Sequence, residues 1–544
     1  METVLTNRGI ELKDIEHYLY TTKDDILPCD LLLNMREGAK MLVKHIQEEN
    51  KIFIQVDCDA DGYCSSAILI NYLYSLFPYF TTNNITYRLH DGKEHGVILG
   101  TIPEGTKLVI IPDAGSNQFL EHKALKEEGK DILVIDHHEA MMKSEDACVI
   151  NNQLGDYPTK SLCGGAMVLK FCTYIDELLG TNNAKEYIDL AALALISDMM
   201  DIRDFETIEY IRQGLASIRN PFFQAMVHKQ EYSLKDGLSP INIAFYITPY
   251  INATIRVGNQ EEKRILFESM LDMYSEDLIP STKRGCKGQY ETRVEQACRN
   301  CMNIKKHQGQ ERDKEAERIE QIIEAENLLN NKILAVRLPE GDVNKNLTGL
   351  ICNELMAKYQ KPTLLLSSVG DAWAGSARNF DKSEFKMFKD FCADSGLINY
   401  AEGHQGAFGF SIAKDKFDDF IQYANTELAK YDFTPSYKVD FIFEANNFNG
   451  KDILEIAELK SLWGQNMSEA LIAIENIKVS KENVTLMSPD KSPTIKITLP
   501  NGTTLIKFKA SVEEYEELTS STGCFIMTVI GTCNSNTWNG ITTP

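Results

Sequence analysis

The chain has 544 residues, 43% of them hydrophobic and 25% charged, with a formal net charge of −23. This length predicts about three to four domains. The negative charge excludes a globally basic nucleic-acid-binding protein, so contact with a polyanion requires a local positive patch or bound metal ions. Thirteen scattered cysteines predict a reducing cytoplasm. The first residues, METVLTNRGIELKD, lack a signal-peptide pattern, and the absence of about 18 consecutive apolar residues predicts no transmembrane helix.

Three apolar runs each lead into acidic residues. KIFIQV (51–56) precedes DCDADG (57–62), KLVIIP (107–112) precedes Asp113, and ILVI (132–135) precedes Asp136-His137-His138. Short β-branched runs that alternate with helical patterns predict parallel strands of an α/β sheet. Ligands bind beyond the carboxyl ends of such strands, so these carboxylates and imidazoles are expected at one edge of one sheet.

Gathered carboxylates repel one another unless a cation neutralises them. Oxygen ligands with one or two imidazoles suit Mn²⁺ or Mg²⁺. Six protein ligands are too many for one catalytic ion with open positions, but fit two ions that share a bridging carboxylate. A single Asp after a strand is more often a turn or helix cap. Three acidic residues within five positions, followed by Gly and accompanied by Asp-His-His, favour the metal interpretation.

Helical patterns surround these motifs. They are expected at 31–49, 65–77, 165–179 and 185–202, and a strand followed by a glycine-bearing loop is expected within 84–99. Asp198 lies near the end of the apolar segment 185–202, where an acidic group needs a partner. It either reaches water at the end of the helix or is a further metal ligand.

A second α/β unit is expected at 332–431, with strands at 333–338 and 362–368, joined to the first by a long helix at 309–331. It contains GSAR (375–378) and EGHQGAFGF (402–410), whose glycines permit tight turns or close approach of a ligand. Upstream, the stretch 283–318 has an excess of basic residues. This stretch is either a solvated helix face with paired charges or a contact surface for a polyanion, with Arg284, Arg293 and Arg299 as the best candidates.

From Phe433 onward, short alternating runs predict antiparallel strands, and Asn-Gly pairs at 501–502 and 539–540 predict hairpins. A small OB-like β-barrel fits this pattern. The expected organisation is a catalytic α/β domain (1–258), a helical connector (259–331), a second α/β domain (332–431) and the barrel (433–544).

The acidic motifs resemble those of RecJ-type single-strand exonucleases of the DHH phosphoesterase superfamily. DCDADG resembles the first motif, D-x-D-A-D-G; Asp113 stands at the second, Asp136-His137-His138 at the third, and LISDMMDI with Asp198 at the fourth. ITPYINATIR (247–256), GSAR, GHQGAFGF and WGQN (463–466) resemble later segments in the same order. Two positions depart from the pattern: Gln55, where some members have His, and Glu402, where Gly is usual.

The resemblance implies a parallel-sheet DHH domain, a DHH-associated α/β domain, and 5′→3′ exonuclease activity on single-stranded DNA with two Mn²⁺ or Mg²⁺ ions. On the family pattern, one ion is held by Asp57 and Asp59 and the other by Asp61, His137 and Asp198, with Asp113 as the bridge. Asp136 and His138 orient His137, and His138 contacts the phosphate, so that Asp113, His137 and His138 form the catalytic set. Candidate contacts to the strand, each of which can also be structural, are Asn252, Arg256, Arg378 and His404.

Other expectations follow from the resemblance. The protein is expected to act as a monomer in a bacterial cytoplasm, encoded by a bacterium or a phage, with a single-strand-binding protein or a helicase as partners. Two alternatives stay open. One is a phosphodiesterase for short oligonucleotides or cyclic dinucleotides, although the C-terminal barrel favours a longer strand. The other is a RecJ-like replication scaffold without catalysis, although such scaffolds lose metal ligands and this chain keeps every carboxylate of the set.

Overall fold

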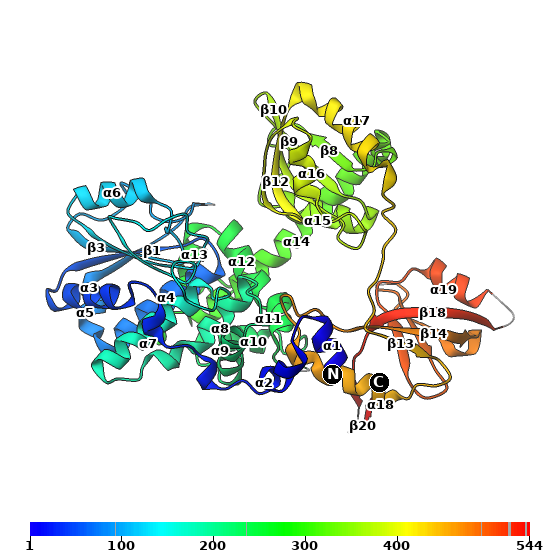
Figure 1. Ribbon diagram of the computed structural model, residues 1–544, viewed down its shortest axis with the longest axis horizontal. Coiled ribbons are helices and arrows are strands. Elements are labelled where there is room, and N and C mark those ends of the chain that lie inside the picture. Colours follow the sequence, from blue (N-terminus) through cyan, green and yellow to red (C-terminus); the bar gives the residue numbers. More distant parts are fainter. Residues whose placement is uncertain (93, 236, 491, 521–523, 539–540) are drawn as a thin grey trace. The chain divides into compact units, whose positions relative to one another are not determined.

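The computed structural model describes residues 1–92, 94–235, 237–490, 492–520, 524–538 and 541–544 (Figure 1). The chain divides into two compact units, Met1–Asn300 with Val439–Pro544, and Cys301–Lys438. Each unit is described by itself. The four-domain division expected from the sequence stays a prediction.

A five-stranded parallel sheet forms the centre of the first unit, in the order β2-β1-β3-β4-β5. Its strands are β1 (Lys51–Val56), β2 (Ile85–Leu89), β3 (Thr106–Pro112), β4 (Asp131–Asp136) and β5 (Cys148–Asn151). The apolar runs of the sequence form β1, β3 and β4, where almost every residue is buried because helices cover both faces. The predicted parallel α/β sheet is therefore confirmed.

Helices pack on both faces of this sheet (Figure 1). On one face, α6 (Phe119–Glu127) contributes Leu125 to a core that includes Phe53 and Val109. The opposite face is covered by helices that include α3 (Met35–Gln47) and α7 (Gly164–Leu179). The α3 backbone approaches the sheet so closely at Gly38 that an added Cβ would lie 2.9 Å from Leu133 Cδ1. Glycine thus permits this close approach, because any larger residue would displace the ends of neighbouring side chains.

Two helices begin earlier than the sequence pattern indicates. Helix α4 (Ala60–Leu76) begins at Ala60 because the Asp59 carboxylate accepts a hydrogen bond from the Gly62 N–H (2.9 Å) and caps the helix. Helix α14 (Arg293–Ala325) begins at Arg293 because the Thr292 hydroxyl accepts from the Glu295 N–H (3.1 Å) while Glu295 accepts from the Thr292 N–H (3.0 Å). Such reciprocal caps start a helix without any apolar periodicity.

The first unit contains further short elements. Between its N-terminus and α14, the other α-helices are α1 (Glu2–Asn7), α2 (Ile15–Leu19), α5 (Pro78–Asn84), α8 (Ile188–Ser197), α9 (Phe205–Ala216), α10 (Pro221–Lys229), α11 (Pro240–Tyr246), α12 (Thr248–Val257) and α13 (Gln260–Glu268), with a hairpin of β6 (Leu278–Pro280) and β7 (Tyr290–Thr292). Within the described part of the chain, no helix is both long and apolar enough to span a bilayer.

The second unit is built on a mixed sheet in the order β11-β12-β10-β9-β8. Its strands are β8 (Leu334–Leu338), β9 (Thr363–Val369), β10 (Ala372–Arg378), β11 (Ile398–His404) and β12 (Ala407–Ala413), and its helices are α15 (Thr348–Tyr359), α16 (Phe388–Asp394) and α17 (Phe417–Glu427). Only β8 and β9 pair in parallel among these strands. Separate apolar clusters lie on the two faces of the sheet, which makes this unit α/β as expected.

The C-terminal segment of the first unit contains several small sheets. One joins β13 (Phe441–Glu444), β14 (Leu471–Val479) and β18 (Phe525–Thr532), and another joins β15 (Val484–Met487), β16 (Thr494–Thr498) and β17 (Thr504–Lys507). A two-stranded ladder joins β19 (Asn536–Trp538) and β20 (Ile541–Thr543); two helices, α18 (Gly450–Ala457) and α19 (Val512–Thr519), accompany them. Strands β16 and β17 are antiparallel, with Asn501 and Gly502 in their connection, which confirms that predicted hairpin.

The second predicted turn, 539–540, lies outside the described residues. Separate sheets of three strands do not establish a closed barrel, so the OB-like architecture remains a prediction.

Candidate metal centre

The carboxyl ends of three adjacent strands bring the acidic motifs together. Asp57 follows β1, Asp113 follows β3, and Asp136 ends β4. Two groups of side chains place ligand atoms within 4.8 Å of one another: Asp57, Asp59 and Asp113 in the first, and Asp61, His137 and Asp198 in the second. The structure therefore brings together the residues that the sequence analysis placed at this edge of the sheet.

Asp61 is held in place by the start of a neighbouring helix. It lies in the first turn of α4 and is 1% exposed. Its two oxygens accept hydrogen bonds from the N–H groups of Gly164 and Gly165 at the start of α7, both at 2.8 Å. The unpaired N–H groups and the dipole of a helix N-terminus favour a negative charge. Asp61 is thus held in a fixed orientation at the start of α7.

Asp113 and His137 face each other in the middle of the cluster. His137 Nε2 lies 3.2 Å from Asp113 Oδ1, 3.4 Å from Asp198 Oδ2 and 3.7 Å from Asp61 Oδ2. Both His137 Nε2 and Asp113 Oδ1 are buried without a hydrogen-bond partner among the described residues. Asp113 also has a positive φ of 66°, a conformation that is unfavourable for a residue with a side chain. Buried polar atoms that converge without partners are the arrangement expected of metal ligands.

The electrostatics of this cluster are unfavourable in the absence of a cation. Burial, followed by repulsion from Asp61 and Asp59, raises the pKa of Asp113 well above its ordinary value. The same causes raise the pKa of Asp198 to about 8. Burial and then Asp61 raise the pKa of Asp59 to about 6, and burial lowers the pKa of His137. A divalent cation would remove this penalty, so the residues present fit a metal centre.

Asp136 orients both histidines, and hydrogen bonds already occupy both of its oxygens. One oxygen accepts from the backbone N–H groups of His137 (2.7 Å) and His138 (3.1 Å) and lies 2.8 Å from His138 Nδ1; the other accepts from the Ser116 N–H (3.0 Å). The hydrogen bond to Asp136 raises the pKa of His138 to about 9 despite partial burial. His138 is therefore cationic near neutral pH, with a side chain 58% exposed.

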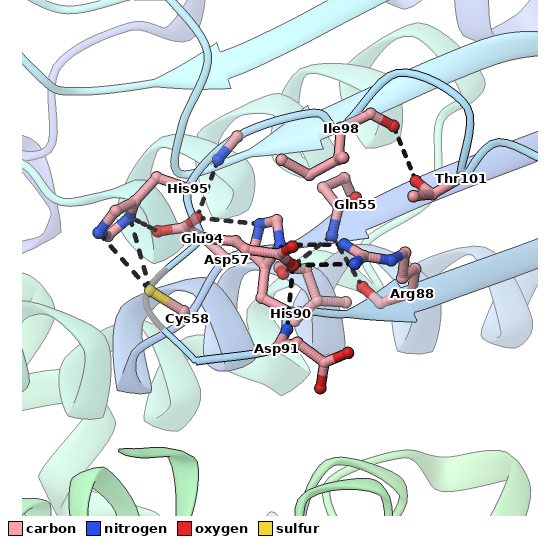
Figure 2. A network of polar contacts seen from close by, with 12 residues as sticks. Gln55, Asp57, Cys58, Arg88, His90, Asp91, Glu94, His95, Ile98 and Thr101 are labelled. Atoms are coloured by element: carbon pink, nitrogen blue, oxygen red, sulfur yellow. Dashed lines mark hydrogen bonds and ion pairs between the residues drawn. The ribbon is translucent and has the colours of Figure 1, made fainter. Parts of the chain in front are cut away.

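Both carboxylate oxygens of Asp57 contact residues of the loop that follows β2. Asp57 Oδ2 lies 3.0 Å from His95 Nδ1, while Oδ1 accepts from the Gly96 N–H at 3.2 Å and lies 3.5 Å from His90 Nε2 (Figure 2). Burial alone would raise the pKa of Asp57, but these partners outweigh it and lower the pKa to about 2. Asp57 is ionised, and partners from the loop after β2 already contact both of its oxygens.

Comparison with known proteins identifies the family of this chain. Residues 51–195 match the DHH family, N-terminal domain. A SPbeta prophage-derived protein of Bacillus subtilis (strain 168), YorK, which is named as a single-strand DNA-specific exonuclease, is 38% identical over 100% of this chain and 94% of its own length. The chain therefore belongs to the RecJ-type exonucleases of the DHH family.

More distant RecJ proteins match as well. The single-stranded-DNA-specific exonuclease RecJ of Bacillus subtilis is 23% identical over 92% of this chain and 61% of its own length. The fold is that of the crystal structure of RecJ in complex with Mn²⁺ from Thermus thermophilus, with a TM-score of 0.69 at 17% identity, covering 99% of this chain and 76% of that chain.

The four candidate strand contacts of this RecJ-type chain lie in different surroundings. Asn252, on α12, accepts a hydrogen bond from the Ala60 N–H at 3.2 Å and so lies at the start of α4, next to the acidic cluster. Arg256 is exposed one turn further along α12. In the second unit, Arg378 ends β10 and donates to the Ala377 carbonyl (2.7 Å), and His404 is exposed at the end of β11. Their contacts with DNA stay predictions.

Some of the basic residues in the stretch 283–318 are held in ion pairs. Arg293 donates to Glu268 (2.8 Å) and Asp277 (3.0 Å), and Arg299 is paired with Glu291. Two of the three arginines predicted to contact a strand are thus already held by carboxylates of the first unit. For Arg293 and Arg299, this favours the interpretation as paired structural charge.

The histidines of the loop after β2 were missed in the sequence analysis. Gln55, which stands where some DHH proteins have His, donates to the Arg88 carbonyl (3.1 Å), and Arg88 is paired with Glu94 (2.8 Å) in the network of Figure 2. The available signal was two histidines within HDGKEH (90–95), directly after a strand of the same sheet. Without the fold, nothing connects them to Asp57.

Proposed function

We propose that this RecJ-type protein degrades single-stranded DNA from the 5′ end, hydrolysing phosphodiester bonds with two divalent ions, Mn²⁺ or Mg²⁺. The observation that carries the proposal is the meeting of the two ligand groups around Asp113, whose buried Oδ1 has no partner among the described residues. Family membership supports the reaction class. The names of its relatives support single-stranded DNA as the substrate.

In this proposal Asp57 and Asp59 hold one ion, Asp61, His137 and Asp198 hold the other, and Asp113 is shared. When bound, the ions supply an activated water and neutralise charge on the scissile phosphate and the leaving oxygen. Asp59 is the firmer ligand of the first pair, because both Asp57 oxygens already face the loop after β2. Asp136 holds His137 and His138 in place through its hydrogen bonds to both residues.

His138 would bind the phosphate. Its Nδ1 faces Asp136, so Nε2 points its proton toward the exposed side of the ring. A cationic imidazole that is fixed in orientation can donate to a phosphate oxygen without rearranging during the reaction. Asn252, Arg256, Arg378 and His404 remain the candidates for holding the rest of the strand. A C-terminal OB-like module would extend the track for longer strands.

The decisive experiment uses single strands of DNA and RNA labelled at either end, incubated with Mn²⁺, Mg²⁺ or EDTA. We expect mononucleotides to be released from the 5′ label on DNA, and no reaction in EDTA. Release from the 3′ label would overturn the polarity. A preference for very short oligonucleotides or cyclic dinucleotides would support the alternative phosphodiesterase, and the absence of hydrolysis with either metal would support the scaffold.

A further inference from the structure

Another group of potential metal ligands lies beside the carboxylate centre and contains a thiol. Cys58, between the first two acidic residues of DCDADG, places Sγ 3.6 Å from both ring nitrogens of His95. His95 Nδ1 in turn lies 3.0 Å from Asp57 Oδ2. Ligand atoms of Asp57, Cys58 and His95 all lie within 4.8 Å of one another. Figure 2 shows the three side chains converging from the end of β1 and from the loop after β2.

The spacing of these donors is close to that of a zinc site. Zn–S bonds of about 2.3 Å and Zn–N bonds of about 2.05 Å at tetrahedral angles place S and N about 3.6 Å apart, and place N and a carboxylate O about 3.3 Å apart. The observed S···N distance already has that value, and the observed N···O distance of 3.0 Å needs to open by a few tenths of an ångström. Sγ is equally far from both ring nitrogens, so it does not lie on the lone-pair side of Nδ1. A single ion at Nδ1 therefore reaches all three groups once the partly exposed Cys58 side chain turns toward it.

Neighbouring groups hold Asp57 in position through hydrogen bonds, as is usual around metal sites. Asp57 Oδ1 is held by the Gly96 N–H (3.2 Å) and faces His90, which leaves Oδ2 for an ion. His90 Nδ1 is in turn fixed by Glu94 at 3.2 Å. Hydrogen bonds to ligating groups orient them and strengthen binding. The His95 side chain is 67% exposed, so an ion can enter from solvent and water can complete its coordination.

We propose that Cys58, His95 and Asp57 form a binding site for Zn²⁺ that is separate from the Mn²⁺ or Mg²⁺ centre. Thiolate and imidazole donors select zinc over these harder ions, which prefer the carboxylates of Asp59, Asp61 and Asp113. Binding displaces the thiol proton of Cys58 and the Nδ1 proton of His95 to solvent, and no other bond changes. Among the described residues, Cys58 is the only cysteine in any such ligand group.

Such a site would make the enzyme sensitive to zinc. Asp57 is the residue that the two centres have in common, because its carboxylate also belongs to the group with Asp59 and Asp113. An ion held by Cys58, His95 and Asp57 would compete for the Asp57 carboxylate with the proposed catalytic pair. Zn²⁺ should then inhibit hydrolysis supported by Mg²⁺. This consequence rests on the proposed function, whereas the binding itself does not.

Binding is tested with Co²⁺ as a spectroscopic probe for zinc, on the full-length protein in excess Mg²⁺. We expect one equivalent of Co²⁺ to give a cobalt–thiolate absorption band that Zn²⁺ displaces. The band should disappear in Cys58→Ser and weaken in His95→Gln. It should persist in the matched control Cys524→Ser, because Cys524 is exposed and belongs to no ligand group found among the described residues. Circular dichroism monitors the fold of each variant.

No band in the wild-type protein, or an unchanged band in Cys58→Ser, would overturn the proposal. Zinc affinity provides a second measurement: Cys58→Ser should weaken Zn²⁺ binding by at least about tenfold, since loss of a group in a metal site costs about 10–100-fold or more. If hydrolysis is observed, the same variant should need at least about ten times more Zn²⁺ for inhibition while keeping its activity with Mg²⁺. Absence of hydrolysis would contradict the proposed function and leave the spectroscopic result intact.

Discussion

At the scale of single residues, the chain separates carboxylates that are stabilised by the protein from those that are not. Asp61 and Asp136 each accept several hydrogen bonds from their surroundings. Asp113 and Asp198 face His137 instead, an imidazole whose pKa is lowered by burial, and burial beside other acids raises the pKa of both carboxyls. Hydrogen bonds from the protein therefore hold Asp61 and Asp136 in place. Asp113 and Asp198 instead need bound cations to offset the cost of ionising their carboxyl groups.

Replacing Asp113 by Asn should lower hydrolysis but raise the melting temperature of the metal-free protein. We expect hydrolysis to fall by at least about a hundredfold, because a ligand shared by two ions contributes several kcal/mol of transition-state stabilisation. The metal-free variant should melt at a higher temperature than the wild type, because Asn removes the cost of burying an acid among other acids. Asp156→Asn, an exposed change in the same domain, is the control and should alter neither quantity. Activity retained with Mn²⁺ would contradict the role of Asp113.

Asp198 predicts a pH dependence of the metal-free protein. Its pKa rises from 3.8 to about 8 on folding, so between these values the folded state binds more protons than the unfolded state. The free energy of unfolding therefore falls as pH rises from about 4 to about 8. In EDTA, the melting temperature of the wild type should drop relative to Asp198→Asn across this range. Mn²⁺, which binds the ionised carboxylates, should reverse the difference, and parallel melting curves in EDTA would contradict the prediction.

At the scale of elements, helix starts position the ligands. The start of α4 carries Asp59 and Asp61, and the start of α7 binds Asp61 through two backbone N–H groups. Close approach of α7 requires glycine. A Cβ at Gly164 would lie 2.6 Å from Asp113 Cβ and 2.7 Å from its Cγ. The backbone of α7 thus forms one wall of the proposed metal centre.

Gly164→Ala should accordingly weaken metal binding at the proposed centre while α7 stays folded. We expect metal affinity and hydrolysis to fall by at least about tenfold, because Asp113 has to move by several tenths of an ångström. Isothermal titration with Mn²⁺ would measure the change. Gly309→Ala is the matched control: it also lies within a helix, α14, but its Cβ would meet nothing within 4 Å. That substitution should stabilise the protein by up to about 1 kcal/mol and leave catalysis unchanged.

How well a feature can be predicted depends on how far apart in the sequence its contacting residues lie. The apolar runs that became β1, β3 and β4 are local signals, and the acidic residues at their ends followed from the geometry of parallel sheets. The Thr292 and Glu295 cap that starts α14 is also local, but the polar first turns of this helix carry no apolar periodicity that would predict its early start. The contact of Asp57 with His95 spans 38 positions and two strands, so no local pattern encodes it.

At the scale of the whole molecule, the first compact unit includes both ends of the sequence. Arg8 donates to Asp440 (3.0 Å), and to the carbonyls of Ser468 (3.0 Å) and Glu469 (2.9 Å). The Ile241 N–H donates to the Trp463 carbonyl at 3.1 Å. The C-terminal segment is therefore packed against the N-terminal helices, and its removal would expose buried surface as well as shorten any track for DNA.

Substitutions at Arg8 and Asp440 test whether the C-terminal segment stabilises the first unit, and they change the protein less than truncation does. Their side chains are 10% and 4% exposed, so removing one partner leaves a nearly buried charge. Arg8→Ala should lower the free energy of unfolding by about 2–4 kcal/mol. Hydrolysis of a dinucleotide well below the melting temperature should stay unchanged, because the metal ligands lie elsewhere. Denaturant unfolding of Arg8→Ala, of Asp440→Asn and of the double variant would give the coupling energy. Additive effects of the two substitutions would show that this ion pair does not connect the C-terminal segment to the rest of the unit.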